Sequence, residues 1–162
     1  GAAFGALYQR RSAEGIAAAR LGSHLIASDL AALGITVDCL PLADVPVPGS
    51  HDVIGDRAYG ITTEQVSALA RAVADGLADG GVLPVLKHIP GHGRARADSH
   101  KNLPVVDTDK ATLEATDFAA FQPLADLPLA MTAHVVFTAF DPKLPATTSP
   151  RSEEHTSELQ SH

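Results

Sequence analysis

The sequence predicts an α/β fold in which parallel strands alternate with helices. Three strand candidates, residues 35–42, 82–86 and 129–137, are separated by segments with helical spacing rather than by short turns. Strand, loop and helix in repeated order imply parallel strands joined by crossover helices. The polar loops follow the strands, at the end where parallel barrels and open sheets both place their sites. With 162 residues, of which 45% are hydrophobic, the chain is long enough for one such domain.

The first helix is expected to begin at Ser12, which can cap it, and to end at Gly34. Its expected apolar members, which follow helical spacing, are Ala18, Leu21, Leu25 and Ala32. Apolar and polar residues then alternate from Ile35 onward, which predicts a short strand ending near Leu42.

The second unit begins after a Pro- and Gly-rich loop over residues 43–60. Thr62 and Gln65 have the spacing of a capping box, so they predict the start of a helix that Gly80 and Gly81 end. The expected buried face of this helix is Val66, Leu69, Ala70, Val73 and Leu77. Residues 82–86 form a nearly continuous apolar run, typical of a strand covered on both faces. Pro84 argues against a central position for this strand, because proline has no backbone N–H to donate to a neighbouring strand.

The third unit follows an irregular Gly-, Arg- and His-rich stretch over residues 90–102. Residues 107–126 are expected to be helical, and residues 129–137 form the last expected strand, with His134 as a satisfied core histidine. The expected apolar members of the helix are Leu113, Phe118, Phe121 and Leu124.

Composition excludes several classes of protein. A net charge of -7 without a run of Lys or Arg argues against a nucleic-acid partner. No apolar stretch approaches the roughly 18 residues of a membrane-spanning helix, so no membrane partner is expected. The single Cys39 excludes an internal disulfide framework. No phosphate-binding glycine fingerprint follows a strand, which disfavours a nucleotide-binding fold.

The chemistry is concentrated in residues 87–100, KHIPGHGRARADSH, which hold three His, one Lys, two Arg and one Asp. Asp98 stands two residues before His100, so its carboxylate can hydrogen-bond one ring nitrogen in an extended segment. The other nitrogen is then free to give and take a proton as a general acid and base. By spacing alone, the same pair is also compatible with an ordinary surface hydrogen bond.

A metal site is the competing hypothesis. His88, His92 and Asp98 supply the ligand types of zinc, and they are the basis for a metal-dependent hydrolase or metal-binding module as the alternative. His88 and His92 flank Pro90 and Gly91, so they share no helical face, and the nearby Lys and Arg residues place positive charge beside a cation. We therefore expect no metal and no cofactor.

The string KHIPGHGRARADSH, followed by Leu103 and Pro104, resembles the signature of glycoside hydrolase family 3, in particular its bacterial β-N-acetylglucosaminidase branch that recycles peptidoglycan. Residues 37–45 and 54–60 are similar to the same branch. The resemblance implies a TIM-type (β/α)8 barrel and a retaining hydrolase of terminal β-linked N-acetylglucosamine, acting on peptidoglycan-derived muropeptides in the cytoplasm. It implies that Asp98 and His100 are the acid/base pair, that Arg57, Lys87 and His88 bind the sugar, and that His92 is a weaker candidate for the same pocket.

The resemblance covers residues 1–150, which we expect to be a partial barrel cut at both ends. Gly1 leads directly into apolar sequence, and residues 151–162, RSEEHTSELQSH, resemble a translated sequencing adapter; a natural polar tail is the alternative. The family's nucleophile is an Asp on a later strand that this chain does not reach. We therefore expect the chain alone to be inactive. A non-catalytic sugar-binding barrel is the remaining alternative.

Overall fold

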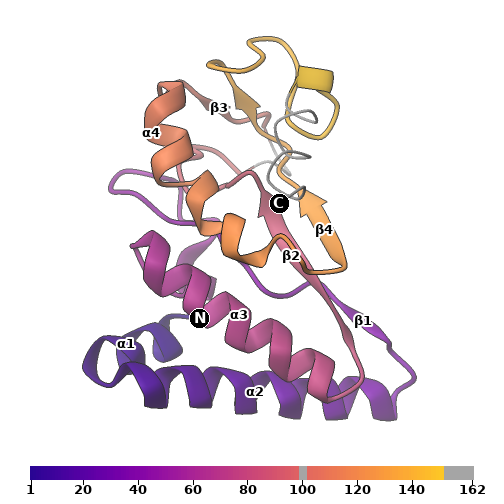
Figure 1. Cartoon of the computed structure of the whole chain (residues 1–162). Helices are drawn as coiled ribbons and strands as arrows, with labels where there is room; N and C mark the ends of the chain where they lie inside the picture. Colours follow the sequence, from indigo (N-terminus) through magenta and orange to yellow (C-terminus); the bar gives the residue numbers. More distant parts are fainter. Residues whose placement is uncertain (99–101, 152–162) are drawn as a thin grey trace.

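The structure is a computed structural model that describes residues 1–98 and 102–151. It is an α/β arrangement around a parallel sheet of order β1-β2-β4, which confirms the predicted fold class (Figure 1). The helices are α1 (Ala2–Arg10), α2 (Ser12–Ala32), α3 (Thr63–Asp79) and α4 (Lys110–Ala115). The strands are β1 (Val37–Asp38), β2 (Leu83–Ile89), β3 (Val105–Val106), β4 (Leu129–Thr132) and β5 (Val136–Phe137). Three short 3-10 turns are η1 (Gly55–Arg57), η2 (Phe118–Ala120) and η3 (Gln122–Leu124).

Pro84 lies in the central strand, contrary to the expectation from its missing donor. The backbone N–H groups of Leu83 and Val85 face the β1 side, where they donate to Thr36 O and Leu40 O, both at 2.8 Å. The nitrogen of Pro84 therefore faces the opposite side. Pairing with β4 begins only at Val85, so no ladder bond is lost at the proline.

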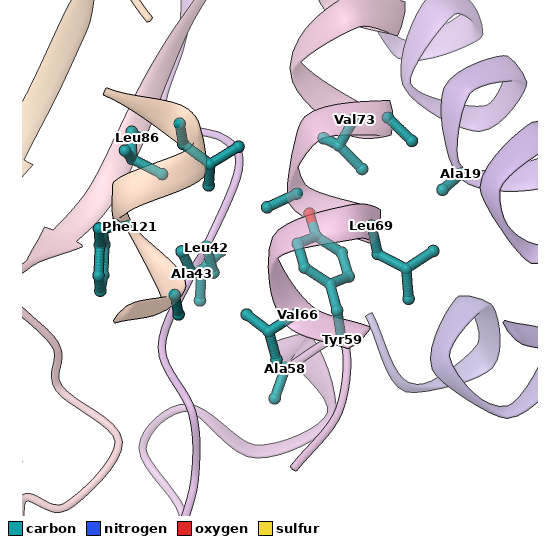
Figure 2. Close-up of a cluster of buried hydrophobic side chains, with 14 of the residues drawn as sticks. Ala19, Leu42, Ala43, Ala58, Tyr59, Val66, Leu69, Val73, Leu86 and Phe121 are labelled. Atoms are coloured by element: carbon teal, nitrogen blue, oxygen red, sulfur yellow. The ribbon is translucent and has the colours of Figure 1, made fainter. Parts of the chain in front are cut away.

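Helix α3 lies between the sheet and α2 (Figure 1), and all five residues of its predicted apolar face are buried. Figure 2 shows Val66, Leu69 and Val73 on this helix, with Leu42, Leu86 and Phe121 in the same cluster. Thr62 caps α3 by accepting a hydrogen bond from Gln65 N at 3.4 Å, as the spacing predicts. The Gln65 side chain does not complete a capping box, because its Oε1 accepts from Gln9 Nε2 at 3.4 Å, while its Nε2 donates to Tyr59 O at 2.7 Å and Gly5 O at 3.2 Å.

The face that α2 buries differs from the prediction. Leu21 and Leu25 are 60% and 57% exposed, and Ala32 is exposed as well. The buried residues are Gly15, Ala19, Ser23 and Ala27, spaced four apart. This stripe of small residues lets α3 approach closely: a Cβ on Gly76 of α3 would lie 2.1 Å from Ser23 Oγ. Ser12 is the first helical residue rather than the cap, which is Arg11.

The third unit is more broken than the sequence suggests. The helix expected over residues 107–126 is α4 followed by the turns η2 and η3, although its four predicted apolar members are all buried. The strand expected over residues 129–137 divides into β4 and β5, and β5 pairs with β3 in a second, two-stranded sheet. His134 lies in the connection between them and is exposed, so the prediction of a core histidine is wrong.

Hydrophobic burial is divided between two clusters. The larger contains α3, the end of β2 and the segment 42–45, and the smaller contains Phe118, Val135 and Phe137 beside α4. In the parts of the chain that the structure describes, no helix is both long and apolar enough to cross a bilayer.

Candidate active site at the carboxyl ends of the strands

The segment after β1 and the end of β2 run side by side and bring two polar stretches together. Leu42 forms a parallel bridge with Lys87, and Ala43 N donates to Lys87 O at 2.7 Å. Asp44, the next residue, is 0% exposed. The chain therefore carries a charged side chain into the interior immediately beside the end of β2.

Asp44 is the centre of the polar cluster. Its Oδ2 lies 2.7 Å from Nδ1 of His88. Its Oδ1 accepts the backbone N–H of His88 at 3.3 Å and that of His92 at 2.7 Å. A buried carboxylate with three donors around it satisfies the requirement that buried charge be hydrogen-bonded. One side chain thus holds both histidines of the predicted pocket.

His92 is buried beside His88, with ring centroids 5.7 Å apart. Burial lowers the pKa of His92 below its ordinary value, partly offset by the negative charge of Asp44. Its Nδ1 is buried without a hydrogen-bond partner in the described parts of the chain. A neutral ring at this position places no positive charge against His88.

The loop after β2 is fastened to the loop after β1. Val47 N donates to Gly93 O at 3.3 Å, and His51 N donates to Ala95 O at 2.8 Å. Gly93 is required for this contact, because a Cβ there would lie 2.0 Å from Val45 O. The two loops therefore form one layer over the ends of the strands.

A second anchor joins this layer to the region after α4. Arg94 Nε lies 2.6 Å from Oδ2 of Asp117, which is 2% exposed, and Arg94 Nη2 donates to Thr116 Oγ1 at 2.9 Å. Such charge-assisted bonds in a partly buried site are stronger than neutral ones. Arg94, considered in the sequence only for its charge, holds the loop that carries Asp98.

The other predicted site residues lie at the end of β2, in η1 and at the end of the loop after β2. Lys87 is half-buried next to His88 at the end of β2. Arg57 is exposed in η1, where its guanidinium donates to Ile54 O at 3.2 Å and to Val53 O. The contacts of Arg57 hold its own loop. Asp98 is half-buried at the end of the loop, and His100 lies outside the described residues, so the predicted Asp98–His100 pair stays a prediction.

The five Asp residues that follow the motif have structural roles. Asp109 caps α4 through Thr112 N at 2.9 Å, Asp117 pairs with Arg94, and Asp141 accepts from two backbone N–H groups and from the Ser149 hydroxyl. The other two also bond neighbouring side chains, Asp107 with Thr138 and Asp126 with Arg71.

The metal hypothesis names His88, His92 and Asp98 as ligands. In residues 1–98 and 102–151, no three His, Cys, Asp or Glu side chains are grouped so that they could hold a metal ion.

Asp44 is the site residue that the sequence reasoning did not single out. It lies within one of the stretches on which the resemblance rests, but no role was assigned to it. The available signal was its position: a charged residue between Ala43 and Val45, just after a predicted strand, is poorly suited to an apolar interior unless it has partners there.

Comparison with known proteins places this geometry in a family. The sequence profile described as "Glycosyl hydrolase family 3 N terminal domain" matches residues 3–152. The chain belongs to glycosyl hydrolase family 3. A protein named Beta-hexosaminidase from Alkalilimnicola ehrlichii is 42% identical over 146 residues, which are 89% of this chain and 41% of that protein.

Solved family 3 structures have the same fold. NagZ from Neisseria gonorrhoeae, in complex with N-trifluoroacetyl-D-glucosamine, has a TM-score of 0.81 at 35% identity over 88% of this chain and 42% of that one. A glycoside hydrolase family 3 β-N-acetylglucosaminidase from Paenibacillus has a TM-score of 0.83 at 39% identity over 89% of this chain and 28% of that one. The described structure is thus a fragment of the family's TIM-type barrel, as the resemblance implies. The chain spans about two fifths of the length of the curated relatives it matches.

Proposed function

We propose that the full-length protein carrying this chain is a retaining glycoside hydrolase that removes terminal β-linked N-acetylglucosamine. The observation that supports this most strongly is the similarity to proteins named Beta-hexosaminidase over 89% of the chain, which includes the motif at residues 87–100. The N-trifluoroacetyl-D-glucosamine bound to the Neisseria gonorrhoeae relative points to the same sugar class. Peptidoglycan-derived muropeptides are the proposed natural substrate and the cytoplasm the proposed compartment.

The proposed reaction has two steps. In the first, an Asp carboxylate attacks the anomeric carbon while His100, oriented by Asp98, protonates the glycosidic oxygen, so that the bond to the leaving alcohol breaks. In the second, His100 takes a proton from water as that water attacks the anomeric carbon and releases the enzyme's carboxylate. Two inversions at the same carbon give a product with retained configuration.

The nucleophile is proposed to be an Asp outside residues 1–162. The five Asp residues after the motif support this, because each of them is engaged in holding local structure. We expect the purified 162-residue chain not to hydrolyse p-nitrophenyl N-acetyl-β-D-glucosaminide. Detectable turnover that survives repeated purification would contradict this placement of the nucleophile.

Sugar binding is assigned to the polar groups at the end of β2 and in the loop after β1. Lys87 and His88 are proposed to hydrogen-bond sugar hydroxyls, with Arg57 approaching from η1 and His92 as a weaker contributor. Hydroxyl groups both donate and accept, so charged and imidazole groups suit them.

The decisive experiment follows the anomeric configuration of the product. Full-length enzyme is mixed with the chromogenic N-acetylglucosaminide, and proton NMR records the first sugar anomer released. The proposal expects the β-anomer first, an N-acetyl preference over the glucoside, and the same rate in chelator. First release of the α-anomer would overturn the retaining mechanism, and loss of turnover in chelator would favour the metal-dependent alternative. Saturable sugar binding without turnover would favour the non-catalytic barrel.

A further inference from the structure

A fully buried carboxylate that the mechanism above does not use lies beneath the proposed sugar-binding pair. We propose that Asp44 is a positioning residue that fixes the ring orientation and tautomer of His88, so that His88 Nε2 accepts a hydrogen bond from a sugar hydroxyl. The inference rests on the proposed function, since a sugar hydroxyl is the ligand that the ring is set to receive.

The tautomer follows from the donors around the carboxylate. Oδ1 of Asp44 is occupied by the backbone N–H groups of His88 and His92, which can only donate. Oδ2 faces Nδ1 of His88 at 2.7 Å. A buried carboxylate in this arrangement requires a donor from the ring, so Nδ1 carries the proton. In a neutral imidazole the lone pair is then on Nε2.

The exposed edge of the ring is the edge that meets the ligand. The His88 side chain is 19% exposed, whereas Asp44 is fully enclosed. Nδ1 is held by the carboxylate on the buried side, so Nε2 is the nitrogen left for substrate. An acceptor at this position selects a group that can donate, such as a hydroxyl, over a carboxylate or phosphate oxygen, which cannot.

The same carboxylate couples ring position to loop position. Because Oδ1 holds the N–H groups of both His88 and His92, the loop that leads to Asp98 starts from a point fixed relative to the His88 ring. The sugar-binding ring and the origin of the acid/base loop therefore share one anchor.

Asp44→Asn is the informative variant, because it keeps the size and shape of the side chain and changes the tautomer of the His88 ring. The asparagine oxygen can still accept the two backbone N–H groups. Its NH2 group would then face His88 and donate to Nδ1, which moves the ring proton to Nε2. The control is Asp141→Asn, which also removes a buried carboxylate that accepts two backbone N–H groups, at 2.9 Å and 3.2 Å, but one whose side-chain partner among the described residues is the Ser149 hydroxyl rather than a histidine.

The first measurement is the tautomer itself, from long-range ¹⁵N–¹H correlation spectra of the His88 ring in the full-length protein. The wild type and Asp141→Asn are expected to show the Nδ1–H form, and Asp44→Asn the Nε2–H form. A wild-type ring protonated on Nε2, or on both nitrogens, would overturn the proposal. This outcome is read without any variant and without turnover, so it is distinguishable from failure of the proposed activity.

The second measurement is kcat/KM for N-acetylglucosaminides in which each free hydroxyl is replaced in turn by hydrogen or fluorine. Fluorine cannot donate. In the wild type, replacing the hydroxyl at one position by either hydrogen or fluorine is expected to lower kcat/KM roughly 10- to 100-fold, because the His88 acceptor is left unpaired. In Asp44→Asn, KM for the natural sugar is expected to rise about tenfold, and fluorine at that position to be tolerated better than hydrogen. If the wild type and Asp44→Asn had the same ratio of kcat/KM for the fluorine and hydrogen substrates, the assignment of His88 Nε2 as an acceptor would be contradicted.

Discussion

At the scale of single residues, proton transfer by His100 makes the sharpest prediction about chemistry. Replacing His100 with Ala in the full-length enzyme should lower kcat by roughly 10²- to 10⁴-fold on a substrate with a poor leaving group, the usual scale of general acid/base help. The loss should be smaller with a good leaving group, which needs less protonation. Steady-state kinetics on two aryl glycosides measure this.

The control for that variant is His51→Ala, which replaces an exposed histidine in the loop after β1 and keeps the backbone N–H that bonds Ala95 O. His51→Ala should keep wild-type turnover. A His100→Ala enzyme that also kept it on the poor leaving group would remove His100 from the proposed role.

His92 makes a prediction about stability and pH. Burial lowers the pKa of His92 below its ordinary 6.5, so the folded state favours the neutral ring. As pH falls below 6.5, the unfolded chain takes up a proton that the folded chain resists, and stability is lost until pH reaches the folded-state pKa. Urea unfolding at pH 7.5 and 5.5 should show that the free energy of unfolding falls less between these pH values for His92→Phe than for the wild type.

The matching control is His134→Phe, because His134 is an exposed histidine in the connection between β4 and β5. Its loss of stability between the two pH values should equal that of the wild type. Identical pH dependence in all three proteins would show that His92 is not held neutral by burial.

The sequence revealed the types of residue at the site better than their arrangement. The density of His, Lys, Arg and Asp over residues 87–100 indicated where the chemistry lies. It could not indicate that Asp44 holds His88 and His92, because that contact joins positions 44 and 48 residues apart. Contacts across such a separation are set by strand register, which single-residue patterns do not encode.

At the scale of elements, the α2–α3 contact makes a prediction that opposes helix propensity. By helix propensity alone, Gly76→Ala should stabilise α3 by up to about 1 kcal/mol. It should nevertheless destabilise the protein by roughly 1–3 kcal/mol. The reason is that its Cβ would lie 2.1 Å from Ser23 Oγ and 2.2 Å from Arg20 O. Denaturant unfolding of the variant and the wild type measures the difference.

Gly22→Ala is the matched control within α2. Its Cβ would meet the tip of the Phe4 ring, at 2.8 Å, and a flexible side chain can move away. We expect Gly22→Ala to be neutral or slightly stabilising. If Gly76→Ala and Gly22→Ala stabilised the protein equally, close packing of the α2 and α3 backbones would not be the reason for glycine at position 76.

Element prediction succeeded where one pattern dominated and failed where two competed. α3 has a single continuous apolar face and a cap, and both were predicted. In α2, large apolar residues and small residues form separate stripes. The small residues are the buried ones, because they allow α3 to approach closely. The strand expected over 129–137 looked continuous because its hydrophobicity is continuous, although the chain leaves the first sheet after Thr132.

At the scale of the whole molecule, the apolar surface left uncovered makes a prediction about association. Large apolar residues are exposed on α2 and along the edge strands, including Leu21, Leu25, Val37, Leu129 and Met131. Apolar side chains left exposed in this number favour association when they lie together on the surface. We expect the 162-residue chain to self-associate with rising concentration, as measured by light scattering.

The double variant Leu21→Lys/Leu25→Lys should reduce that association without loss of helix content, because both side chains point away from α3 and lysine is a good helix former. As a control, Arg10→Lys on α1 should leave it unchanged. If association were as strong in the double variant, α2 would not be the associating surface.

The fold class was predictable from the order of elements alone, and the barrel came only from the resemblance. Three alternating units imply a parallel sheet, but they do not determine whether it closes. The similarity of residues 3–152 to family 3, together with the solved relatives, supplies that information.

The fastening of the two loops has a consequence for how this chain can vary in length. Asp44 reaches both His88 and His92, and the backbone contacts continue through Gly93 to Ala95. An insertion or deletion anywhere in 88–95 would break that alignment, whereas point replacements of outward side chains would not. Natural variants and engineered grafts should therefore tolerate added residues only downstream of Ala95.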